Sequence, residues 1–237
     1  MSHIVTLFDA SITDFVTQMV GRSDAFDMAV VAIQATSLVL EVLVAAYWWA
    51  WFRRGDPKTV HRTRGILIMS VIGVVGAVGL SFLLKSSFPS RGRPLHELGS
   101  FGPHRFALDP HAVGFHAAFP SHHEMVAFAL VTGLLLVSWR VGVAASLWAA
   151  VVMGGPEVYL GLHYPSDLVG GAALGVAVVL IFNLPLVREV VAERIVAVSD
   201  DWPAIFYPAW FTLTVQTATL FGDGVPLAHW LTAVLRH

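Results

Sequence analysis

Two short polar segments, residues 119–124 and 161–167, interrupt long apolar stretches and carry side chains suited to nucleophilic or acid–base chemistry. In the second segment, His163 and Asp167 are four residues apart and share one face if the segment is helical. A carboxylate bound to one ring nitrogen fixes the tautomer and leaves the other nitrogen free to attack. Because Pro165 and Asp167 also suit a helix start, this pair alone is compatible with a simple cap.

The first segment contains Ser121 and His123 at the start of an apolar stretch. A serine at this position can cap a helix, and the amides of the first helical turn then form a site for an anion. A histidine beside bound phosphate could protonate a departing oxygen as a general acid. A capped helix with interfacial histidines remains the alternative for this segment.

A third polar segment, residues 85–94, is basic and contains Lys85, Arg91 and Arg93. Such cations can bind phosphate, and arginine suits bidentate contact with its oxygens. Taken alone, these residues are also compatible with side chains that reach lipid headgroups.

The composition indicates that these segments lie at a membrane. Of 237 residues, 56% are hydrophobic and 13% are charged, against about 25% charged in soluble domains. The chain has no cysteine, which excludes disulfides, thiolate nucleophiles and cysteine metal sites. No basic stretch is interleaved with aromatic residues, so nucleic acid is not an expected partner.

The apolar stretches predict an all-α, polytopic membrane helix bundle with about six transmembrane helices. Residues 1–25 are expected to form an amphipathic interfacial segment, residues 26–198 the membrane core, and residues 199–237 a C-terminal segment with a possible sixth span. The expected spans are residues 27–52, 65–84, 124–139, 141–160, 168–187 and 205–221.

Positive charge predicts the orientation of these spans. Five basic residues crowd the short connection between the first two spans, which indicates that this connection is cytoplasmic: Arg53, Arg54, Lys58, Arg62 and Arg64. The three polar segments, distant in sequence, then meet at the outer face of the membrane. The sequence therefore predicts a phosphate site at a membrane surface.

The combination of segments resembles the type-2 phosphatidic acid phosphatase superfamily of membrane lipid phosphatases. That family has Lys-x6-Arg-Pro, then Pro-Ser-Gly-His, then Ser-Arg-x5-His-x3-Asp. Here Lys85 and Arg93 match the first element with one extra residue between them, and His122 replaces the glycine of the second. His163 and Asp167 match the end of the third. The run Leu-Gly-Leu-His-Tyr-Pro-Ser-Asp looks most like bacterial undecaprenyl pyrophosphate phosphatases.

One position departs from the family: Glu157 stands where the resemblance places a phosphate-binding arginine. A carboxylate there repels phosphate. Three readings follow: Arg91 supplies the missing cation, a protonated Glu157 donates a hydrogen bond, or the site is weakened or retuned.

The resemblance implies hydrolysis of a lipid phosphate without metal or other cofactor. His163 would form a phosphohistidine, Asp167 would orient it, and His123 would protonate the leaving oxygen and then activate water. Phosphate would be bound at Lys85, Arg91, Arg93, Ser121, His122 and Glu157. The implied substrate is a polyprenyl diphosphate of the bacterial cell envelope, handled for peptidoglycan synthesis at the outer face of the cytoplasmic membrane.

Other functions remain compatible with the sequence. The same nucleophile could pass phosphate to a lipid or sugar hydroxyl, or a protein with Glu157 could bind lipid phosphate without turnover. Metal binding is a further alternative, because the region before His123 is rich in histidines, including His104, His111 and His116. Their spacing matches no compact ligand motif. Membrane lipids are expected partners, and the sequence does not define an oligomeric state.

Overall fold

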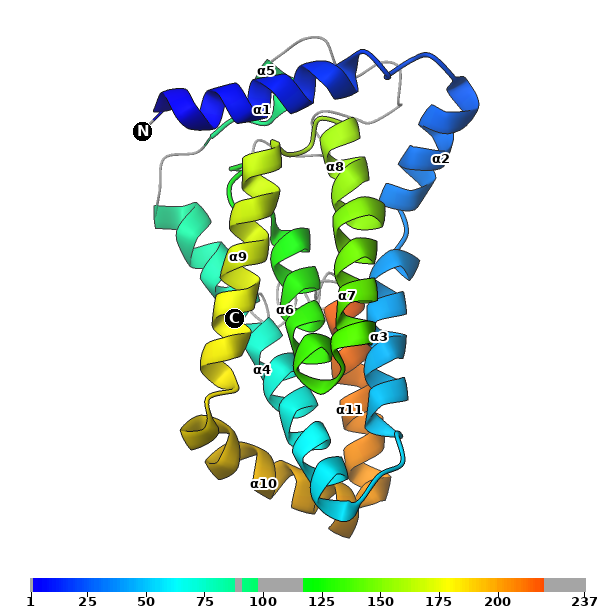
Figure 1. Cartoon of the computed structure of the whole chain (residues 1–237), viewed down its shortest axis with the longest axis vertical. Coiled ribbons are helices and arrows are strands. Elements are labelled where there is room, and N and C mark those ends of the chain that lie inside the picture. The colour runs from blue at the N-terminus through cyan, green and yellow to red at the C-terminus, as the bar shows by residue number, and fades with distance from the viewer. Residues whose placement is uncertain (1, 88–90, 98–116, 220–237) are drawn as a thin grey trace, which may run out of the picture.

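The computed structural model describes residues 2–87, 91–97 and 117–219, and within these ranges the chain forms helices and no strand. Figure 1 shows them as a bundle. The helices are α1 (Ser2–Thr17), α2 (Asp24–Gln34), α3 (Leu38–Trp51), α4 (Pro57–Ser87), α5 (Pro94–Glu97), α6 (His122–Val137), α7 (Trp139–Trp148), the π-helical turn η1 (Ala149–Gly154), α8 (Gly155–Tyr159), α9 (Pro165–Phe182), α10 (Pro185–Asp201) and α11 (Pro203–Ala218).

Helix α6 lies at the centre of the bundle and packs against α9, α4, α7 and α3. Figure 1 shows α1 crossing one end, above α8 and α9, and α10 lying at the other end. The interior is apolar, and many of its most buried side chains come from α4 and α6. This arrangement fixes the N-terminus of α6 beside the N-terminus of α9.

Two glycines bring α6 and α9 into close contact. A Cβ atom at Gly171 would lie 2.5 Å from the carbonyl oxygen of Ser121, and one at Gly175 would lie 2.2 Å from that of Met125. Small residues four apart allow this approach between membrane helices. The backbone amide of Ser121 donates to the carbonyl of Asp167 at 3.1 Å. The two polar segments of the sequence are thereby joined directly.

The apolar helices are those of a membrane protein. Three have the length and composition to cross a bilayer, namely Pro57–Ser87, Trp139–Tyr159 and Pro165–Phe182. A fourth is obtained if α2 and α3, which are bent by 51° at residues 35–37, are counted as one span. Large apolar side chains on these helices are exposed, as expected for surfaces that face lipid, among them Phe82, Leu147, Val151, Val169 and Ile181.

The prediction of about six spans is not confirmed. Helix α6 is apolar but has 16 residues, and α11 also has 16, fewer than the roughly 20 that cross the hydrocarbon core at 1.5 Å per residue. Ser121 and Ser138 bound α6, because the first caps the helix and the second has extended backbone. The predicted spans 124–139 and 205–221 therefore correspond to short helices.

Two other boundaries differ from the prediction. The span expected at residues 27–52 is interrupted where Thr36 Oγ1 accepts from the amide of Leu38 and Ser37 Oγ donates to Glu41. Such local hydrogen bonds compete with the helical ladder. The span expected to run to residue 187 ends at Phe182, because Pro185 starts α10.

No helix was predicted at residues 188–198, which belong to α10. This helix carries several charged residues and lies at the end of the bundle away from α1 (Figure 1). Residues 2–17 form helix α1. The interfacial position of that helix and the proposed division at residues 25 and 198 stay predictions.

Candidate functional site

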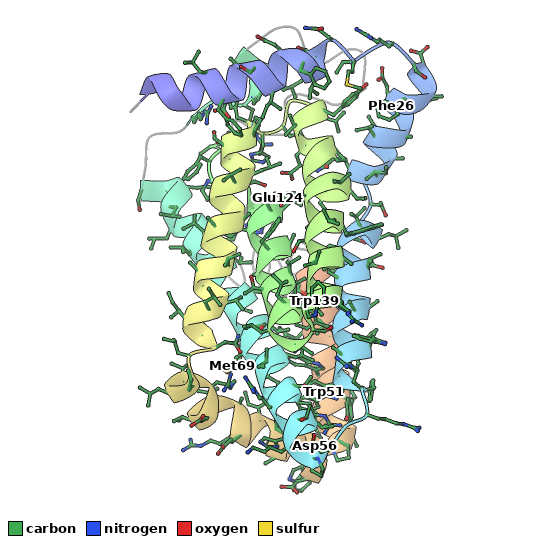
Figure 2. The ribbon with its side chains drawn as sticks, viewed as in Figure 1. Phe26, Trp51, Asp56, Met69, Glu124 and Trp139 are labelled. Carbon is green, nitrogen blue, oxygen red and sulfur yellow. The ribbon has the colours of Figure 1, made fainter. Side chains whose placement is uncertain are left out.

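The three polar segments meet at the end of the bundle that α1 crosses. The amide of Leu95 donates to the carbonyl of Gly161 at 2.8 Å, and the amide of Ala118 donates to the carbonyl of Arg91 at 2.9 Å. Figure 2 shows Glu124, at the start of α6, in this half of the bundle, whereas Asp56, in the basic connection between α3 and α4, lies at the opposite end. The sequence-predicted residues are thus brought together.

His163 stands in a tight connection between α8 and α9. The amide of Gly161 donates to the carbonyl of Val158 at 3.1 Å, and the amide of Leu162 donates to that of Glu157 at 2.9 Å. This pair of bonds is the Schellman motif, which closes a helix with a residue in the left-handed conformation. Gly161 has φ 67°, which favours glycine. Pro165 then starts α9 two residues after His163.

Gly161→Ala should destabilise the protein. Alanine in the left-handed region costs about 1–2 kcal/mol, so the melting temperature in detergent should fall by a few degrees. Gly155→Ala is the matched control, because Gly155 lies in regular helix and nothing lies within 4 Å of its added Cβ. We expect that variant to melt at or above the wild-type temperature. Equal melting temperatures for the two variants would contradict the assigned turn.

Asp167 caps α9 and faces the nucleophile candidate. Its Oδ2 accepts from the amide of Tyr164 at 2.8 Å and lies 3.9 Å from Nδ1 of His163. The second distance exceeds that of a hydrogen bond, so the carboxylate faces the ring without bonding to it. The structure therefore shows Asp167 as a helix cap, and its predicted role as the carboxylate that orients His163 stays a prediction.

His163 is buried, with 3% of its surface exposed, and its Nδ1 has no hydrogen-bond partner among the described residues. Burial lowers the pKa of His163 to about 4, against the effect of Glu157 and with a further contribution from Arg93 and Lys85. The ring is therefore neutral at physiological pH. A neutral imidazole is the form that can attack phosphorus.

Glu157 organises the start of α6. Its carboxylate accepts from Ser121 Oγ at 2.7 Å and lies 3.0 Å from Nδ1 of His123. A carboxylate can only accept, so Nδ1 of His123 carries the proton and Nε2 remains available. Ser121 Oγ also accepts from the amide of Glu124 and so caps α6. This cap was expected from sequence, whereas the contact of Glu157 with His123 was not.

A cavity of about 210 Å³ gives access to this pair. It is lined by His123 and Glu157 together with residues around the break between α2 and α3. The side chain of His123 is 45% exposed, in contrast to the buried Glu157. His123 is therefore the more accessible member of the pair.

Lys85 and Arg93 form the cationic part of the site. They interact electrostatically with each other and with Glu157 and Asp167. Arg93 Nη1 donates to the carbonyl of Leu162 at 3.4 Å, while its buried Nε lacks a partner among the described residues. Burial lowers the pKa of Arg93. Its open donor is the kind of group that a phosphoryl oxygen would satisfy.

Arg91 is placed differently from Lys85 and Arg93. Its Nη1 donates to Ser166 Oγ at 2.8 Å and to Asp167 Oδ1 at 3.2 Å, and its Nη2 binds Asp9. Glu157 contacts Ser121 and His123, so no hydrogen bond or ion pair joins Arg91 to Glu157 within the described residues, and the hypothesis that Arg91 supplies the missing cation is left without support from these contacts. His122 packs at ring-centroid distances of 5.7 Å from Phe82 and 6.4 Å from His123.

Sequence reasoning did not find Asp9 and Ser166 at this site. Asp9 is 2% exposed and lies on the same helical face as Ile12, Thr13 and Val16. A lone carboxylate on the inward face of an amphipathic helix was the available signal. No group of metal-binding side chains occurs in the ranges that the structure describes. The histidines considered as metal ligands, His104, His111 and His116, lie outside those ranges.

The fold is that of a helical membrane protein in which three polar segments meet at one end of the bundle. The chain belongs to the PAP2 superfamily, whose family model matches residues 65–187. This match includes each sequence-predicted site residue and supports phosphatase activity on lipid phosphates. Neither a curated protein nor a solved structure matches the chain.

Proposed function

We propose that the protein hydrolyses a lipid phosphate through a phosphohistidine on His163. The observation that carries this proposal is the convergence of a buried, neutral His163 with Asp167, His123 and the Lys85–Arg93 cations in a PAP2 superfamily member. These groups supply a nucleophile, a proton donor and positive charge for the phosphoryl oxygens.

The reaction proceeds in two displacements at phosphorus. A ring nitrogen of His163 bonds to phosphorus while the bond to the leaving oxygen breaks, and His123 gives that oxygen a proton. His123 then takes a proton from water, whose oxygen attacks the phosphohistidine. Inorganic phosphate departs with the water oxygen and His163 is regenerated. Lys85, Arg93 and the amides at the Ser121 cap hold the phosphoryl oxygens.

The proposed substrate is a polyprenyl diphosphate such as undecaprenyl diphosphate, at the outer face of a bacterial cytoplasmic membrane. The Leu-Gly-Leu-His-Tyr-Pro-Ser-Asp run supports the lipid class. The basic residues between α3 and α4 support the orientation, because they lie away from the site and favour the cytoplasmic side.

The direct test is phosphate release by purified protein from undecaprenyl diphosphate, phosphatidic acid and phosphatidylglycerol phosphate, with and without EDTA. We expect release from the polyprenyl diphosphate to be fastest and to survive the chelator, because Lys85 and Arg93 supply the positive charge. Labelled transfer to an added alcohol acceptor in place of water would indicate a phosphotransferase. No release from any of these lipids would refute hydrolysis, and loss in EDTA that metal restores would refute the metal-free mechanism.

The pH dependence should report the burial of His163. The nucleophile must be neutral, so its contribution to activity is lost as the pH falls through its pKa of about 4. The general acid His123 must be protonated, so it governs the alkaline side of the profile. We expect the acid limb of kcat/KM to have its midpoint below about pH 5. The pH profiles of kcat/KM for a lipid monophosphate and a lipid diphosphate are compared, because a limb that shifts between them comes from ionisation of the substrate. A midpoint near 6.5, the unshifted histidine value, that is independent of substrate and persists in Asp167→Asn would contradict the buried nucleophile.

A further inference from the structure

Helix α1 reaches the site through one buried carboxylate. In Figure 1 it crosses above α8 and α9. Asp9 Oδ1 accepts from the amide of Ser166 at 2.9 Å, and its Oδ2 accepts from Ser166 Oγ at 2.8 Å and from Arg91. Both oxygens of Asp9 are thus bound to the first turn of α9 and to the basic segment. This places α1 in direct contact with the residues beside Asp167.

Arg91 links this carboxylate to Asp167. Its guanidinium lies between the two acidic groups and stacks on the ring of Tyr164, 3.9 Å from the centroid. Although burial disfavours its charge, the carboxylates of Asp9 and Asp167 raise the pKa of Arg91. A planar guanidinium held by two carboxylates and an aromatic face is fixed in orientation. Its Nη1 and Nη2 are then directed at protein oxygens.

The link continues to the nucleophile. The Oδ1 atom of Asp167 accepts a hydrogen bond from Arg91, and Oδ2 accepts one from the amide of Tyr164. This Oδ2 atom lies 3.9 Å from Nδ1 of His163. Asp167 is therefore held from two directions with one edge toward the histidine. Without a fixed Arg91, Asp167 would keep only the bond from Tyr164, and small misplacements of catalytic groups are costly.

We propose that Asp9 is a positioning residue of the catalytic site, which acts through Arg91 to hold Asp167 against His163. The inference rests on the proposed function for its kinetic consequence. It assigns Arg91 to positioning, whereas Lys85 and Arg93 bind phosphate. Helix α1 is then part of the site, in addition to any contact it makes with lipid.

Asp9→Asn is the test variant, since it keeps the shape of the side chain and removes its charge. We expect kcat to fall about tenfold with KM nearly unchanged, because Asp9 touches no substrate. Asp14→Asn is the matched control: Asp14 lies on the same helix, is exposed, and should leave both constants unchanged. Ser166→Ala, which removes one hydroxyl from the same cluster, should lower kcat less and serves if Asp9→Asn does not fold.

Arg91→Gln separates positioning from phosphate binding. If Arg91 acts with Asp9, the variant lowers kcat, and adding Asp9→Asn costs little more because the two residues act as a unit. A rise in KM with kcat unchanged would assign Arg91 to the substrate and overturn the inference. Fully additive losses in the double variant would overturn it as well.

The position of the His163 ring can also be followed by NMR, in a measurement that needs neither substrate nor enzymatic activity. In protein labelled with ¹⁵N-histidine, with His163→Gln used for assignment, the His163 signal should shift in Asp9→Asn and not in Asp14→Asn. An unshifted signal overturns the inference even if the protein is an active phosphatase. A shifted signal supports it even in protein that releases no phosphate, an outcome that would refute the proposed function alone.

Discussion

His163→Ala should reduce phosphate release to background, a loss of at least about a thousandfold or about 4 kcal/mol in the activation barrier. Water cannot replace a covalent nucleophile that is held in line with the leaving group. The protein should still fold, because Nδ1 of His163 makes no hydrogen bond to any described residue and its loss leaves no partner unsatisfied there. The sequence places this residue at a loop boundary, whereas the structure buries it. His163→Gln therefore accompanies it to fill the space.

The measurement is phosphate release together with trapping of the phosphoenzyme, by quenching in alkaline SDS after mixing with ³²P-labelled lipid. Wild-type protein should carry an acid-labile, base-stable phosphoryl group, and both His163 variants should carry none. His61→Ala is the control, because His61 is exposed at the start of α4, at the other end of the bundle. More than about a tenth of wild-type turnover in His163→Ala would show that another group is the nucleophile.

The sequence predicted the helical class and the meeting of the three polar segments, because both have local signals. The catalytic and binding roles of their residues stay predictions. Long apolar stretches mark helices regardless of their partners, and His163, Asp167, Ser121 and His123 lie in short polar segments with helix-start chemistry. The three polar segments were expected at one membrane face because successive spans cross the bilayer in opposite directions. Charge placement between residues 53 and 64 then predicted which end faces outward.

The rest required tertiary information. Hydropathy does not distinguish a span from a short apolar helix such as α6 that is buried in the bundle, nor does it find the 51° bend between α2 and α3. The contacts of Arg91 with Asp9 join residues 82 positions apart, and no local pattern predicts them. The motif spacing predicted that Arg91 binds phosphate together with Lys85 and Arg93. In the structure Arg91 instead contacts the carboxylates of Asp9 and Asp167.

Glu157→Arg should lower kcat/KM by about a hundredfold or more, about 2.7 kcal/mol, although it restores the residue expected in the family. Glu157 is 1% exposed and accepts from Ser121, while its other oxygen faces His123. Arginine cannot accept a hydrogen bond and would add a third cation beside Lys85 and Arg93. Burying an unpaired charge of this kind also destabilises the fold, by about 3–5 kcal/mol.

Glu157→Gln separates the two effects of that change. Its amide oxygen can still accept from Ser121, so the cap of α6 and the melting temperature should be nearly preserved. The charge that stabilises a protonated His123 is lost, so kcat should fall about tenfold or more while KM changes little. The matched control is the neighbouring Val158→Ala, which leaves both partners of Glu157 in place. Wild-type kcat in Glu157→Gln would show that the carboxylate does not assist His123.

The double variant Arg91→Glu with Glu157→Arg decides whether the extra cation of the basic segment compensates for Glu157. In the structure Arg91 binds Asp9, Ser166 and Asp167, while Glu157 binds Ser121 and His123, so the two side chains share no bond. We therefore expect no recovery, and the Glu at position 91 should worsen the loss because it faces two carboxylates. Recovery of kcat/KM in the double variant would establish direct compensation. A gain in Glu157→Arg alone would mean that Glu157 weakens an otherwise ordinary phosphate site, and that its contacts with Ser121 and His123 contribute nothing to turnover.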